Sequence, residues 1–207
     1  MKNLFEAGFE AGVWFETIVS TYCENKEPHA AAMGCMTHDG STIILKPFTN
    51  TKTYRNLVRH QSLVVNLCHD PAVFFKVVFD EPLSYGQAEK VNAPRLLEAY
   101  AWVEAVLSEL LQNDGLRAEA LCKVIFIYGH FERARPYSRA EHALMESLIH
   151  YTRIKAFAKT EKHAEAVALC ERIKYYEGLL NRVSSKSSHL SMMKRIMSES
   201  RKLVEGT

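Results

Sequence analysis

The chain has 207 residues, of which 47% are hydrophobic, and a formal net charge of +2. This length and composition can bury one sizeable core, which excludes a disordered protein. No apolar run reaches the roughly 18 residues that a membrane-spanning helix needs, and the acids near the start argue against a secretory signal or anchor. Five widely spaced cysteines without a C-x-x-C pair predict reduced thiols in a cytoplasmic protein.

The first part of the chain carries strand signals. The β-branched stretch ETIVSTYCE (16–24) is followed by HAAAMGCMTH (29–38) and STIILKPF (41–48). Asp39 and Gly40 separate the last two stretches, and an Asp-Gly pair between apolar runs is a strong hairpin signal. We therefore predict three consecutive strands.

A helix and a further strand follow. Residues 51–61 are predicted to be helical, and SLVVNLCH (62–69) reads as a buried strand that holds one polar residue, Asn66. Asp70 followed by Pro71 then marks the start of another helix, with proline at its first position.

The middle of the chain allows two interpretations. Residues 96–112 are rich in strong helix formers, and propensity alone predicts a helix there. Asn113, Asp114 and Gly115 then precede a clear strand at 120–132, so a hairpin is the competing prediction. The pattern of residues leaves this choice open.

The remainder of the chain is helical in pattern. The motif SRAE (138–141) is a capping box that begins a helix. A second helix spans about 162–181, and the serine-rich stretch 184–188 separates it from a third. We predict a β-rich domain at 1–135 and a helical region of about three helices at 136–207.

One spaced set of candidate metal ligands occurs. His142, Glu146 and His150 lie four residues apart on one helix face. Metal ligands show this spacing, but so do solvated helix faces, and Arg139 and Arg153 flank the stripe with positive charge. We predict no metal site.

The start of the helix at 51–61 offers a different chemistry. A helix beginning at Thr51 presents free backbone N–H groups that favour an anion. Either this is a capped helix with a solvated basic face, or it binds a phosphate group. The neighbouring hydroxyl and cationic side chains are Thr49, Thr51, Thr53, Lys46, Lys52 and Arg55.

Nucleic-acid binding is a weaker alternative. From Lys155 onward the chain has 11 lysines and arginines against 6 acids, which makes this end basic. Only Phe157, Tyr175 and Tyr176 are present there as stacking groups, so we predict an ordinary solvated helical surface.

Five segments of the chain carry a family resemblance through their order. They are ETIVST (16–21), AAMG (31–34), TYRNL (53–57), VVNLCHDPAVFF (64–75) and RARPYSRAEHALMESLIHYTR (133–153). In that order they resemble the DUF447 family, whose members have the FMN-binding split-barrel fold and are related to flavin reductases. The resemblance covers most of the chain before the last two helices. The chain departs from the family pattern in one place, since Tyr137-Ser138-Arg139-Ala140 stands where members resemble F-N-R-A.

The resemblance implies an α+β protein whose core is mainly β. A six-stranded antiparallel split barrel would carry a C-terminal helical appendage. The barrel needs strands at 99–111 and 118–131, which favours the hairpin over the helix. It also implies a homodimer with FMN in the cleft between subunits.

The implied FMN site joins the helix start to two strands. The phosphate would lie at residues 49–56, and the isoalloxazine ring along 16–21 and 31–34, with Asn66 facing the barrel mouth. No catalytic residue is predicted. The residues expected to bind the cofactor are Ser20, Thr21, Ala32, Met33, Gly34, Lys46, Thr49, Thr51, Thr53, Asn56, Asn66 and Arg153.

The function implied is that of a cytoplasmic FMN-binding flavoprotein, an oxidoreductase of unknown substrate for which a pterin is a conceivable partner. FMN itself would carry the hydride. The alternative is a dimer of the same fold that binds FMN or a protein partner without catalysis.

Overall fold

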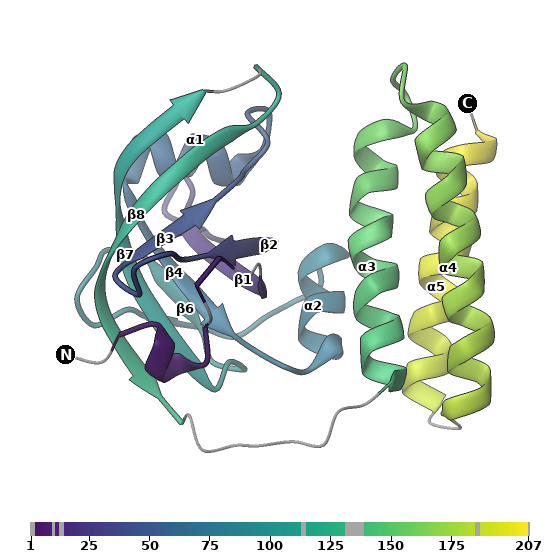
Figure 1. Cartoon of the computed structure of the whole chain (residues 1–207), viewed down its shortest axis with the longest axis horizontal. Helices are drawn as coiled ribbons and strands as arrows, with labels where there is room; N and C mark the ends of the chain where they lie inside the picture. The colour runs from purple at the N-terminus through teal and green to yellow at the C-terminus, as the bar shows by residue number, and fades with distance from the viewer. Residues whose placement is uncertain are drawn as a thin grey trace. The chain divides into compact units, whose positions relative to one another are not determined.

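The computed structural model describes residues 3–9, 11–12, 15–112, 115–130, 139–184 and 187–206 (Figure 1). The chain divides into two compact units. The barrel unit comprises Met1–His69 and Asp80–Ala134, and the helical unit comprises Asp70–Phe79 and Arg135–Thr207.

Six antiparallel strands of the barrel unit form a closed barrel in the order β1-β2-β3-β8-β7-β4. A separate two-stranded sheet pairs β5 with β6. The split-barrel fold is therefore confirmed. The strands are β1 (Phe15–Tyr22), β2 (Pro28–Met36), β3 (Thr42–Leu45), β4 (Ser62–Leu67), β5 (Tyr85–Gln87), β6 (Pro94–Leu96), β7 (Ala101–Gln112) and β8 (Ala118–Gly129).

The ambiguous middle segment is a strand. β7 pairs with β8 along its whole length, although its residues are good helix formers. Ala101, Val103 and Ala105 alternate into the barrel core, and Trp102 lies on the opposite face. Burial on both faces overrides the local helix propensity. The Asn113–Asp114 part of the predicted turn lies outside the described residues.

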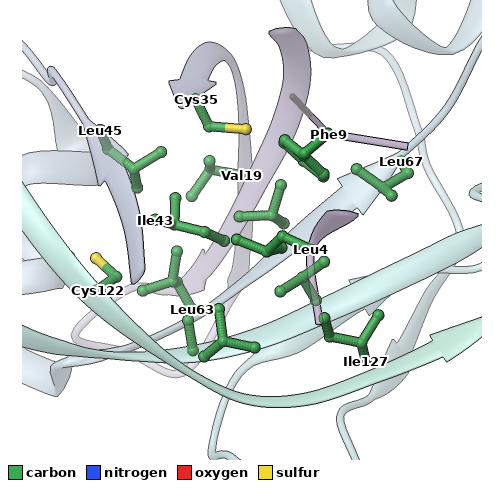
Figure 2. Close-up of a cluster of buried hydrophobic side chains, with 14 of the residues drawn as sticks. Leu4, Phe9, Val19, Cys35, Ile43, Leu45, Leu63, Leu67, Cys122 and Ile127 are labelled. Atoms are coloured by element: carbon green, nitrogen blue, oxygen red, sulfur yellow. The ribbon is translucent and has the colours of Figure 1, made fainter. Parts of the chain in front are cut away.

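Inward-facing side chains of all six strands fill the barrel. Figure 2 shows Val19, Ile43 and Leu63 pointing toward one another, and all three are fully buried. The N-terminal segment adds Leu4 and Phe9 to the same cluster, next to a short 3₁₀ turn, η1 (Phe5–Ala7). The five cysteines form no disulfide in the described structure, and four of them are buried.

Helix α1 (Lys52–His60) contacts β1 and β2 and places Leu57 in the barrel core. Its N-cap is Thr51, whose hydroxyl oxygen accepts a hydrogen bond from the amide of Tyr54. It ends at Gln61, which adopts a left-handed conformation (φ 55°). The predicted helix and its start at Thr51 are confirmed.

The helical unit contains α2 (Pro71–Val78), α3 (Arg139–Phe157), α4 (His163–Val183) and α5 (Ser187–Glu205). As predicted, Asp70 caps α2 and Pro71 takes its first position. The Ser138 capping box lies outside the described residues. No helix in the described ranges is long and apolar enough to cross a membrane.

Candidate functional site

Strand β2 has one edge that is mostly open. On one side it pairs with β1 from Pro28 to Cys35, but on the other it meets β3 only at Cys35 and Met36. Within the described residues, no strand pairs with this second edge from Pro28 to Gly34. Alternate residues of an antiparallel strand direct their N–H and C=O groups to opposite edges. The open stretch therefore presents backbone donors and acceptors that no neighbouring strand uses.

The open stretch is built from small residues. Ala30, Ala31, Ala32 and Gly34 are all half-buried. Met33 packs on the barrel core, and its carbonyl accepts a hydrogen bond from the Thr17 hydroxyl at 2.9 Å. With so little side-chain bulk, a flat molecule can approach the backbone closely.

The first turn of α1 follows a polar loop whose threonine hydroxyls are already used. Thr51 Oγ1 donates to the Phe48 carbonyl at 2.7 Å, and Thr49 Oγ1 donates to the Gly115 carbonyl at 3.0 Å. In the described structure, the backbone amides of Lys52 and Thr53 have no hydrogen-bond partner. These two amides are the free donors of the helix start.

Two of the predicted phosphate ligands point inward. Thr53 is 1% exposed and Asn56 is 7% exposed. Asn56 Nδ2 donates to Thr21 Oγ1 at 3.0 Å, which ties α1 to β1. Thr53 Oγ1 lies 3.1 Å from His29 Nε2 on β2. These contacts make Thr21, Thr53 and Asn56 part of the joint between α1 and the barrel.

His29 is a polar residue of this region that the sequence analysis did not single out. Burial lowers its pKa, and the nearby charges of Lys52 and Arg55 lower it further, whereas Asp80 acts in the opposite direction. The signal was available in the hairpin register, because pairing 16–24 with 29–38 places His29 beside Thr21. The ring therefore sits among cations at the start of α1.

Two protein-family models match this chain. A model described as "Protein of unknown function (DUF447) N-terminal domain" matches residues 15–127, and a second DUF447 model matches residues 138–198. The chain belongs to the DUF447 family.

Solved structures share the fold of this DUF447 protein. An FMN-bound DUF447 protein, MM1853 from Methanosarcina mazei, is 24% identical with a TM-score of 0.76, covering 95% of this chain and 100% of that one. Flavoredoxin of Desulfovibrio vulgaris is 16% identical with a TM-score of 0.50, covering 60% and 74%. Nitrilotriacetate monooxygenase component B from Bacillus cereus is 13% identical with a TM-score of 0.50, covering 67% and 82%.

One prediction about the site of this DUF447 protein is wrong. Asn66 does not face the barrel mouth, since it is fully buried on the outer face of the barrel. Its amide nitrogen donates to the Ile18 carbonyl and to Ser20 Oγ, and its Oδ1 accepts from the amide of Leu96 at 2.7 Å. Ser20 in turn donates to the Pro94 carbonyl at 2.6 Å. Through these hydrogen bonds Ser20 and Asn66 link β1 and β4 to β6.

Two further predicted site residues lie away from the first turn of α1. Lys46 is exposed and forms an ion pair with Glu119 at 3.2 Å. Arg153 is exposed on α3, in the helical unit. On the same helix, His142 and Glu146 are 3.9 Å apart, but within the described residues no three potential ligands form a group that could hold a metal.

A buried carboxylate escaped the sequence analysis. Glu104, in the first half of β7, is fully buried, and its oxygens accept hydrogen bonds from the amides of Glu89, Lys90 and Val91 at 2.7, 2.6 and 3.1 Å. It fixes the segment between β5 and β6 against the barrel. The predicted strand at 99–111 did not reveal it, because the sequence analysis had no prediction for the segment whose amides Glu104 accepts.

Proposed function

We propose that this DUF447 protein binds FMN, with the isoalloxazine ring along the open edge of β2 and the phosphate at the first turn of α1. The observation that carries the proposal is the small-residue stretch from Ala30 to Gly34, whose edge away from β1 is open, beside a helix start with free amides. The ring would take backbone hydrogen bonds from this edge, because its N5 and carbonyl groups lie on the rim of a flat surface.

The arrangement of the two parts suits a flavin nucleotide. A strand advances about 3.3 Å per residue, so β2 extends roughly 13 Å from His29 to Met33. A phosphate on the ribityl arm would lie at one end of this stretch and the ring at the other. The amides of Lys52 and Thr53 would bind the phosphate, helped by the helix dipole and by the charge of Arg55.

The FMN-bound state of MM1853, which aligns with 95% of this chain, supports the proposal. The proposal also includes a homodimer with oxidoreductase activity, and it assigns no substrate. A second copy would cover the flavin that lies on the open strand edge, and isologous pairing would complete both sites at once. Residues 1–135 would form the flavin domain, apart from the α2 segment, which belongs with residues 136–207 to the helical unit.

Flavin titration tests the proposal. We expect FMN to bind more tightly than riboflavin, because only FMN carries the phosphate. Replacing Lys52 and Arg55 together by alanine should weaken FMN by about 1–2 kcal/mol, since both cations are exposed and screened. Riboflavin binding should not change.

Lys123→Ala provides a matched control, because Lys123 is an exposed cation on β8 of the same unit. Absorbance or flavin fluorescence gives the dissociation constants. Equal affinity for FMN and riboflavin would contradict the assignment of a phosphate site to the first turn of α1. If neither flavin binds, the proposed function is refuted.

A further inference from the structure

The half-buried His29 of β2 lies beside the first turn of α1, near charges of both signs. The nitrogen Nε2 of His29 is 3.1 Å from the hydroxyl of Thr53, whose own backbone amide is free. The charged groups that act on the ring are Lys52 and Arg55 of α1 and Asp80 in the segment after α2. The ring thus contacts the same helical turn that presents unpaired donors.

We propose that His29 determines the preference for phosphorylated over unphosphorylated flavin by taking up a proton when the phosphate binds. This inference rests on the proposed function and assigns a role to a residue outside the set predicted from the sequence. In its protonated form the ring adds a third positive charge to those of Lys52 and Arg55. A phosphate dianion needs such a group of cations, whereas the neutral ribityl end of riboflavin does not.

The electrostatics give the direction of this coupling. Burial lowers the pKa of His29, and so do the neighbouring cations, so the ring of the free protein is neutral near pH 7. A bound dianion reverses this balance and raises the pKa. Because the complex then holds more protons than the free protein, FMN affinity increases as the pH falls, and riboflavin affinity stays constant.

The test measures FMN and riboflavin affinity between about pH 6.5 and pH 8, where FMN is mostly the dianion because its second phosphate pKa is about 6. We expect FMN to bind up to about tenfold more tightly at the acid end, since one unit of pKa shift corresponds to a factor of ten. His29→Gln should bind FMN more weakly at the acid end and lose the pH dependence. The same substitution should leave riboflavin affinity unchanged.

His130→Gln is the matched control, because His130 is an exposed histidine of the barrel unit that follows β8. A second measurement needs no variant: proton NMR of the wild-type imidazole should show that FMN, and not riboflavin, raises the pKa of His29. This readout holds even if His29→Gln folds poorly.

The outcomes separate the two proposals. The role of His29 is overturned if FMN affinity has the same pH dependence in the wild type and in His29→Gln. It is also overturned if FMN does not change the imidazole pKa of His29. Either result leaves FMN binding itself intact. Failure of both flavins to bind the wild-type protein overturns the proposed function and this inference with it.

Discussion

Two histidines show how surroundings set the charge of one residue type. His29 is half-buried among the cations of α1, and His150 of α3 is 6% exposed, with Nδ1 unpaired among the described residues. Burial lowers the pKa of His150, Arg153 and Arg172 lower it further, and Glu146 opposes them. Both rings are therefore neutral in the folded protein near pH 7.

This neutrality predicts an acid-sensitive fold. The unfolded chain takes up protons at about pH 6.5, whereas the folded state resists until a lower pH, so stability should decrease as the pH falls below that value. In His150→Leu, the free energy of unfolding should decrease less steeply as the pH falls. Urea unfolding between about pH 5 and 7.5 measures it, with the exposed His142→Gln as the control. A wild-type protein that is equally stable at both ends would contradict the burial of a neutral ring.

Single residues also show where sequence reasoning reached its limit. The cap at Thr51 was predictable, because a hydroxyl before a helical pattern has one local use. The inward direction of Thr53 and Asn56 was not, since the rotation of α1 against the barrel depends on the packing of Leu57. The predicted orientation of Asn66 failed for a similar reason, because the segment that covers it comes thirty residues later in the chain.

At the scale of elements, the strands and helices were largely predictable from periodicity and turn residues. The exception is β7, where propensity favoured a helix and the family resemblance supplied the strand. The physical reason is that one of its two pairing partners, β4, lies before α2, β5 and β6 in the chain, so the burial that favours a strand is not a local property. The position of β5 and β6 over the outer face had no local signal.

The β7–β8 pair also yields a prediction about glycine. Gly129 ends β8 with φ +134°, and a Cβ there would lie 2.4 Å from the Cα of Ala101. Gly129→Ala should therefore destabilise the fold by about 3 kcal/mol or more, because both backbone strain and overlap oppose it.

The matched substitution is Gly178→Ala on α4, where a Cβ would meet nothing within 4 Å. It should stabilise the protein by up to about 1 kcal/mol through helix propensity. Urea denaturation of the two variants compares them directly, and equal effects would show that the close approach at Gly129 does not exist in solution.

At the scale of the whole molecule, the open edge of β2 calls for a partner. Exposed strand edges are normally protected. β1 pairs with one edge of β2, but within the described structure no strand pairs with the other edge before Cys35. We expect a homodimer, which light scattering should show as twice the chain mass of 23.6 kDa. Ala32 pairs with Ile18 on the face of the sheet that points away from Val19 and the barrel core. Substituting Ala32→Lys should favour the monomer and weaken flavin binding together, whereas a monomeric wild type across concentrations would contradict the shared site.

The central claim is that FMN spans the open edge of β2 and the first turn of α1. Amide chemical shifts of the labelled protein, recorded during addition of FMN and then of riboflavin, test it most directly. The account predicts that both flavins shift the amides of residues 30–34, and that only FMN shifts those of Lys52 and Thr53. Shifts confined to other parts of the chain, or identical shifts at Lys52 and Thr53 with both flavins, would contradict it.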